Sequence, residues 1–287
     1  MKIGINLLLW TGHLTEELFP DLEEVKRIGF DGVEVPVFDC SDVDHYRSLA
    51  TSLGDMGLER TAVAVIPDAD HSPISADAAH RRAATEHLRR VIDCSEALGA
   101  TVLAGPYFQP LGIFSGVFPT EDELSRCAEV HSEIVPHARA AGIICALEPL
   151  NRFEAYLLNT CAQSIDYAAR VGEEGFGILY DTFHANIEER DPVEALRTLH
   201  AAGALAHVHI SENDRGVPGR GHAAIRETIT ALRELGYDDW LTIEAFSGAV
   251  PGLSAATRVW RDFFDDPMEV AADGYQYIKA CWESGHA

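Results

Sequence analysis

The feature that most constrains the fold is a repeated pattern of apolar runs and amphipathic segments. Eight short runs rich in β-branched residues each precede a stretch with the apolar spacing of a helix. Strands that alternate with helices pair in parallel through right-handed crossovers. The expected strands are Ile3–Leu9, Gly32–Val37, Glu59–Ile66, Thr101–Gly105, Ile143–Glu148, Gly177–Asp181, Leu205–Ile210 and Trp240–Ala245.

Eight such units in 287 residues predict an α/β fold, a (β/α)8 TIM barrel that forms a single domain over residues 1–287. Glycines mark five expected helix ends, where the left-handed conformation costs this residue least; they are Gly29, Gly57, Gly99, Gly142 and Gly236. The alternative is a doubly wound open sheet. That fold normally has a glycine-rich turn after its first strand, whereas this chain continues with LLWTGHLTEE.

Composition excludes several classes of partner. The chain has 22 Lys and Arg residues against 46 Asp and Glu residues, a net charge of −24, so it repels nucleic acid and anionic membranes. No apolar stretch approaches the roughly 20 residues of a membrane span. The six cysteines form no C-x-x-C pair, and the N-terminal MKIGINLLLW lacks a signal-peptide cleavage site. These features predict free thiols and a cytoplasmic protein.

Acidic and imidazole side chains occur where four consecutive expected strands end. The apolar run Ile143–Leu147 stops at Glu148, and the next three strands carry Asp181, His209 and Glu244 at about the same position. In a TIM barrel the carboxyl ends of all strands meet at the face that holds the active site. Buried carboxylates repel one another unless a cation or hydrogen bonds compensate their charge. The pattern therefore predicts a metal site with these four ligands.

The ligand set indicates the cation. Carboxylate oxygens with one imidazole suit a hard or borderline divalent ion, so one Mn²⁺ fits best, with Co²⁺ or Mg²⁺ as alternatives. Zinc fits less well because no thiolate joins the set. Taken singly, a glutamate at a strand end can instead be a helix cap or ion-pair partner, and a strand histidine can be a core residue. We expect His207 to point away from the barrel-facing set and to be such a core residue.

More polar residues lie in the loops at the same rim. Arg152 and Glu154 follow the fifth strand, His184 the sixth and Arg215 the seventh. Each alone is typical of a solvated loop charge. Their shared position suggests that they bind a polar ligand beside the metal.

Several of these segments resemble the ketose 3-epimerases, which include D-tagatose, D-psicose and L-ribulose 3-epimerases of the xylose-isomerase-like TIM-barrel superfamily. The matching segments are LEPLNRFEAYLLNT, YDTFHANIEE, HVHISENDRG and TIEAFS. LLWTGH near the N-terminus and FSGAVPGLSAATRVWRD after the eighth strand are similar to the L-ribulose 3-epimerase branch. The resemblance extends over nearly the whole chain.

The resemblance implies an isomerase that inverts C3 of a free ketose, of the L-ribulose, D-psicose/D-fructose or D-tagatose type, as a homodimer or homotetramer. It implies that Glu148, Asp181, His209 and Glu244 hold the metal. Glu148 and Glu244 would also be the acid/base pair. The substrate oxygens at the C1–C3 end would be bound by Glu154, His184 and Arg215.

Residues near other strand ends complete the expected pocket. Asn6 occupies a position that faces substrate in the similar enzymes, and Trp10, Ile66 and Phe246 are expected to form the pocket wall unless they are ordinary core residues. The loop AGPYFQPLGIFSGVFPT after the fourth strand departs from the pattern of the family. Because that loop shapes the far end of the pocket, the preferred ketose stays open.

The expected mechanism removes a proton from C3, beside the C2 carbonyl, through a cis-enediolate. One glutamate takes the proton and the other returns one on the opposite face. Rival hypotheses place an aldose–ketose, cyclitol (inosose) or phosphosugar isomerase on the same site. The glycine- and arginine-rich RGVPGRG could bind a phosphate, but similar neutral-sugar epimerases also have a glycine-rich loop here, so the phosphosugar hypothesis ranks lower. A DNA-repair endonuclease of the same superfamily would need more histidines and a basic face. A non-catalytic metal- or sugar-binding module is the remaining alternative.

Overall fold

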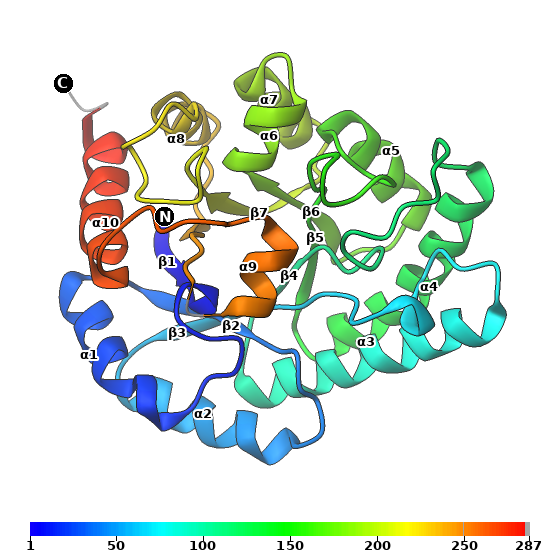
Figure 1. Ribbon diagram of the computed structural model, residues 1–287, viewed down its shortest axis with the longest axis horizontal. Coiled ribbons are helices and arrows are strands. Elements are labelled where there is room, and N and C mark those ends of the chain that lie inside the picture. The colour runs from blue at the N-terminus through cyan, green and yellow to red at the C-terminus, as the bar shows by residue number, and fades with distance from the viewer. Residues whose placement is uncertain (249, 285–287) are drawn as a thin grey trace.

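The computed structural model describes residues 1–248 and 250–284. Within them, eight parallel strands in chain order close into a barrel, because β1 pairs with β8 as well as with β2 (Figure 1). The predicted (β/α)8 barrel is therefore confirmed. The strands are β1 (Lys2–Asn6), β2 (Gly32–Pro36), β3 (Glu59–Val63), β4 (Val102–Gly105), β5 (Ile144–Leu147), β6 (Phe176–Asp181), β7 (Leu205–Ile210) and β8 (Trp240–Ile243).

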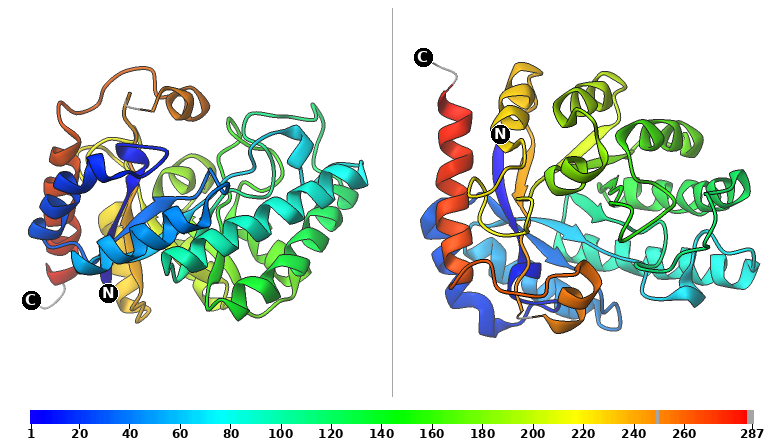
Figure 2. Two further views of the ribbon diagram at one scale, coloured as in Figure 1. Left: turned by 90° about the horizontal axis from the view of Figure 1, so that it is seen from below. Right: turned by 45° about the horizontal axis from the view of Figure 1, so that its top comes forward.

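Helices surround the barrel and connect its strands (Figure 1). They are α1 (Phe19–Ile28), α2 (Val43–Asp55), α3 (Ala78–Leu98), α4 (Glu121–Ala140), α5 (Cys161–Val171), α6 (Thr182–Glu188), α7 (Pro192–Ala201), α8 (Ile225–Glu234), α9 (Pro251–Thr257) and α10 (Pro267–Glu283). The five glycines expected at helix ends all have positive φ angles. The sequence did not predict the short helix α6. Figures 1 and 2 show α9 on the side of the barrel where the strands end.

The first strand is shorter than predicted. It ends at Asn6, whose side-chain oxygen accepts a hydrogen bond from the backbone N–H of Leu8 at 2.9 Å. That bond caps the 3₁₀ turn Leu7–Leu9, so the apolar residues after Asn6 fold as a turn and not as more strand. The first strand therefore delivers a polar side chain to its carboxyl end.

Strand alternation explains why charged residues can reach the barrel interior. Side chains two residues apart on a strand share a face. Ala146 and Leu179 belong to the apolar cluster that fills the barrel, and Glu148 and Asp181 lie two residues beyond them. Likewise, Trp240 begins a face of β8 that continues toward Glu244. The apolar interior thus gives way to acidic side chains at one end of the barrel.

The structure also bears on the predictions about the cysteines and about membrane-spanning segments. All six cysteines are free thiols, as predicted; they are Cys40, Cys94, Cys127, Cys145, Cys161 and Cys281. None of the helices in the described ranges has the length and apolar character that crossing a membrane requires.

Gly105 at the end of β4 gives a direct test of the packing at this rim. It has φ +119°, and a Cβ there would lie 2.2 Å from the carbonyl oxygen of Ala64. Its own carbonyl accepts the N–H of Glu148 at 3.0 Å. We predict that Gly105→Ala lowers the free energy of unfolding by about 1–3 kcal/mol more than Gly116→Ala does. Gly116 also has a positive φ, of +78°, but meets nothing within 4 Å. Urea unfolding measures both changes, and equal losses would contradict the steric argument.

Candidate active site

Four side chains converge at the carboxyl ends of β5 to β8. Glu148 follows β5, Asp181 ends β6, His209 lies in β7 and Glu244 follows β8. One ligand atom from each lies within 4.8 Å of the others, and all four residues are buried. The structure therefore brings together the residues that the sequence predicted as metal ligands.

Two atoms of this cluster have no hydrogen-bond partner although they are buried, namely Glu148 Oε1 and His209 Nδ1. His209 Nδ1 lies 3.4 Å from Glu244 Oε1, 3.8 Å from Asp181 Oδ2 and 3.9 Å from Glu148 Oε1. Buried polar atoms normally have partners. Three carboxylates and one imidazole nitrogen that face a common point fit a divalent cation of the Mn²⁺ or Mg²⁺ kind.

The electrostatics of the cluster show the same need for positive charge. Burial, reinforced by the negative charge of Glu244, raises the pKa of Glu148 well above its usual range. For His209, burial disfavours the charged form, but Glu34 and Glu244 outweigh burial and raise its pKa well above the ordinary value. Without a metal, protons on these groups therefore compensate part of the negative charge.

Arg215 supplies a fixed positive charge beside the cluster. Its Nη1 donates to Glu244 Oε2 at 2.7 Å and lies 3.3 Å from Asp181 Oδ2. The guanidinium stacks over the ring of Phe183, 3.8 Å from the ring centroid, and also lies near Phe246. Burial would raise the pKa of Asp181, but Arg215 and neighbouring histidines lower it overall. The backbone of Arg215 has a φ of +64°, rare for a residue with a side chain.

The loop after β5 contacts the ring of His184. The backbone N–H of Asn151 donates to its Nδ1 at 3.0 Å, which fixes the orientation of the ring. Nε2 is 3.4 Å from Glu148 Oε1 and 3.0 Å from Arg215 Nη2. Burial and the charge of Arg215 lower the pKa of His184, which favours the neutral ring.

A pocket opens directly onto these groups. Glu148, Glu154, His184, Arg215, Glu244 and Phe246 line it, together with Leu8, Val63, Val65, Pro106, Leu111, Leu150, Leu253 and Thr257. Leu253 and Thr257 belong to α9, which thus covers part of the pocket. Polar groups at one end and apolar walls elsewhere suit a small polyhydroxylated molecule.

Three other expected substrate contacts, Asn6, Trp10 and Ile66, are not among the described residues that line this pocket. Asn6 lies beneath the cluster, where its amide donates to Glu34 Oε1 and Glu244 Oε1 at 3.0 and 3.1 Å. We therefore describe Asn6 as a support for Glu244. Trp10 packs half-buried against the core, and Ile66 is buried there. Contact of either with substrate stays a prediction. Arg152 pairs with Glu188 at an exposed position.

The comparisons with known proteins agree with this geometry. The family model for the xylose isomerase-like TIM barrel matches residues 22–281. The L-ribulose 3-epimerase of Mesorhizobium japonicum is 34% identical over 280 residues, which cover 96% of this chain and 93% of that protein. The ketose 3-epimerase of Arthrobacter globiformis is 33% identical, with coverage of 97% and 96%. This chain belongs to the ketose 3-epimerase family.

Solved structures place the whole barrel within the same family. A structure of L-ribulose 3-epimerase aligns with a TM-score of 0.92 and 34% identity, over 99% of this chain and 95% of that one. A D-allulose 3-epimerase from Methylomonas sp. in complex with D-allulose aligns with a TM-score of 0.89 and 26% identity, over 97% and 96%. The predicted resemblance to ketose 3-epimerases is thereby confirmed, as is assignment to an isomerase family.

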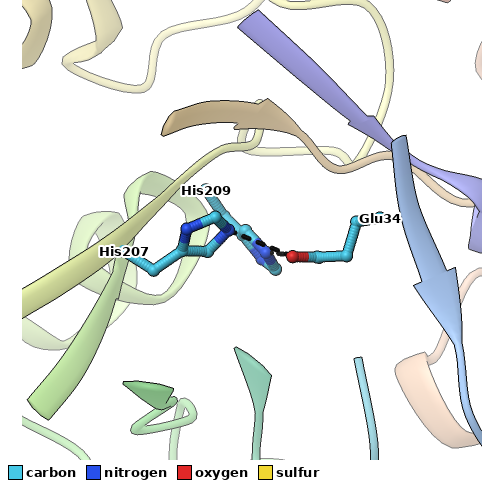
Figure 3. Close-up of side chains that lie close together, drawn as sticks. All are labelled: Glu34, His207 and His209. Carbon is cyan, nitrogen blue, oxygen red and sulfur yellow. Dashed lines mark hydrogen bonds and ion pairs between the residues drawn. The ribbon is translucent and has the colours of Figure 1, made fainter. Parts of the chain in front are cut away.

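The predicted direction of the His207 side chain was wrong. His207 and His209 are two residues apart on β7, so both side chains point into the barrel, where each contacts Glu34 of β2 (Figure 3). His207 is nevertheless a buried interior residue, as expected, and its Nδ1 has no hydrogen-bond partner among the described residues. Glu34 was not predicted from the sequence. Its only signal was a carboxylate in the middle of the apolar run GVEVP.

The raised pKa values of His209 and Glu148 predict that metal binding releases protons. A metal ligand must lose its proton, so raising the pH removes the competitor and strengthens binding. We expect Mn²⁺ binding to the metal-free protein to tighten as the pH rises through neutrality. Titration calorimetry in two buffers of different ionisation enthalpy should give a net proton release greater than zero. Heats that are independent of the buffer, with affinity independent of pH, would contradict this account.

Proposed function

We propose that this protein is a metal-dependent epimerase that inverts C3 of a free ketose. The observation that carries the proposal is the convergence of Glu148, Asp181, His209 and Glu244, of which Glu148 and Glu244 line a pocket with polar groups at one end. Membership of the ketose 3-epimerase family supports the reaction type. The names of the relatives point to L-ribulose, D-psicose (D-allulose) or a similar ketose as substrate.

In this proposal the four converging residues hold one divalent cation, and Mn²⁺ fits their donor set best. When bound, such an ion supplies Lewis-acid polarisation of the carbonyl at C2, which acidifies the proton on C3. The unpartnered Glu148 Oε1 and His209 Nδ1 support this role, because a cation would satisfy both.

Glu148 and Glu244 are the proposed acid/base pair. They reach the pocket floor from β5 and β8, which are separated by β6 and β7 in the barrel, and they are therefore placed to approach a bound ketose from different sides. One carboxylate removes the C3 proton, and the other, in its protonated form, returns a proton to the opposite face of the planar enediolate. The roles exchange when the other epimer binds.

Other pocket residues hold the substrate and the developing charge on its oxygens. His184 directs Nε2 toward Glu148 and Arg215, and Arg215 provides donors that are already fixed by stacking and ion pairs. Donors of this kind stabilise an oxyanion without reorganisation. Glu154, whose Oε1 accepts from Asn151 at 2.7 Å, is placed to accept a substrate hydroxyl. Phe246 adds an apolar wall.

Removing either carboxylate tests the proton transfer. Glu148→Gln and Glu244→Gln should each lower epimerisation by about 10²–10⁴-fold, because each reaction direction needs both groups. Deuterium incorporation at C3 in heavy water, followed by mass spectrometry, measures the loss. Asp181→Asn is the matched control for a ligand without a proton-transfer role, and Glu189→Gln is the control for a carboxylate outside the cluster. Full deuterium exchange of both epimers by both glutamine variants, with manganese bound, would rule out the pair.

A substrate screen tests the reaction class. Metal-free protein supplemented with Mn²⁺ should convert a free pentulose or hexulose into its C3 epimer, identified by chromatography. Ketose phosphates, aldoses and inososes should react more slowly. Preferential turnover of a phosphorylated ketose, or label at C1 or C2 instead of C3, would favour the rival isomerase hypotheses.

Two expectations from the sequence remain predictions. The first is a homodimer or homotetramer, which light scattering of the purified protein would measure. The second is a cytoplasmic location.

A further inference from the structure

Glu34 on β2 is a fully buried carboxylate outside the proposed ligand set. Each of its oxygens has two partners. Oε1 contacts Asn6 Nδ2 at 3.0 Å and His209 Nε2 at 2.7 Å, and Oε2 contacts Thr61 Oγ1 and His207 Nε2, both at 3.0 Å. Figure 3 shows both histidine rings turned toward this carboxylate.

These four contacts fit the ionised form of Glu34. An ionised carboxylate has about four acceptor positions and no donor. A protonated Glu34 would need an acceptor for its own O–H, and its partners are an amide N–H, a hydroxyl and two ring nitrogens that can all donate. With its acceptor positions filled, Glu34 has none left for a metal ion. The Glu34, His207 and His209 cluster is therefore not a second metal site.

We infer that Glu34 is a positioning residue for the proposed reaction: it holds His209 with the proton on Nε2 and so directs the lone pair of Nδ1 at the cation site. Nδ1 is the ring atom that faces the three carboxylates and lacks a partner. The inference rests on the proposed metal site. In many metalloproteins an outer carboxylate of this kind selects the histidine tautomer and increases the basicity of the ligand.

Asn6 extends this support to the acid/base pair. Its amide group donates one hydrogen to Glu34 and the other to Glu244, while its oxygen is engaged by the backbone of Leu8. Glu34 is thus linked to a metal ligand on β7 directly and to Glu244 after β8 through Asn6. These four side chains lie on or directly after β7, β8, β1 and β2, which are successive in the closed barrel, so the barrel fixes their spacing.

The experiment compares Mn²⁺ binding by metal-free wild type and Glu34→Gln, with free Mn²⁺ measured by electron paramagnetic resonance. A glutamine keeps the shape but places an NH₂ group against one histidine. We expect Glu34→Gln to weaken Mn²⁺ binding by about 10–100-fold, the usual effect of losing such a partner. Glu189→Gln, which removes a carboxylate bonded to the Cys161 N–H at 2.7 Å, should bind as wild type does. At saturating Mn²⁺ the KM for the ketose should be unchanged.

A double-mutant cycle separates positioning from a general structural effect. In a His209→Gln background, Glu34→Gln should change the Mn²⁺ affinity by less than about twofold, because the residue it acts through is gone. Wild-type affinity in Glu34→Gln, or an equal loss in both backgrounds, would overturn the inference. If wild type itself bound no Mn²⁺, the proposed function would fail instead.

A measurement on the wild type covers the case in which Glu34→Gln does not fold. In protein labelled with ¹⁵N-histidine and loaded with diamagnetic Mg²⁺, long-range ¹H–¹⁵N spectra report which ring nitrogen carries the proton. His209, assigned by loss of its signals in His209→Gln, should have the proton on Nε2. A proton on Nδ1 with a bare Nε2 would overturn the inference.

Discussion

The close approach of three buried carboxylates and one imidazole is the constraint on which the rest of the site depends. Like charges within 4.8 Å are unfavourable in a protein interior, so the surroundings must supply positive charge or protons. Arg215 provides part of that charge. The unpartnered atoms Glu148 Oε1 and His209 Nδ1 mark where a divalent cation would supply the remainder. Arg215 has a left-handed backbone conformation, which is strained for a residue with a side chain. The strain is tolerated because the guanidinium stacks on Phe183 and pairs with Asp181 and Glu244.

The barrel makes this arrangement possible because the residues that stabilise its interior and the acidic residues at its rim occupy different positions on the same strands. Apolar side chains such as Ala146 and Leu179 fill the interior, and the next inward positions on the same strands carry the acids. Neighbouring strands hold their register through backbone hydrogen bonds, so the ligand atoms need little loop structure to be placed. The loops and α6 contribute the groups proposed to bind substrate, including His184 of α6, whose Nδ1 accepts the backbone N–H of Asn151. This division explains how relatives that share about a third of their residues can share the whole fold.

The sequence predicted the barrel and the convergence of Glu148, Asp181, His209 and Glu244 because both follow from local patterns, namely period-two strands and polar residues at successive strand ends. It did not predict Glu34, although a carboxylate inside GVEVP resembles the one that ends ICALE. The partner His207 is 173 residues away, and one chain contains no sign of that pairing. The predicted direction of the His207 side chain was wrong. Its two-residue spacing from His209 on the same strand already indicates that both side chains share one face. The prediction that Trp10 and Ile66 form the pocket wall depended on loop geometry, which apolar sequence patterns do not specify.

Anomalous diffraction from a crystal of this protein soaked in Mn²⁺ tests the central claim most directly. The account predicts one strong manganese peak among Glu148, Asp181, His209 and Glu244, with the metal bonded to Nδ1 of the histidine. A map without a peak at that point, in crystals that bind manganese elsewhere or not at all, would contradict it.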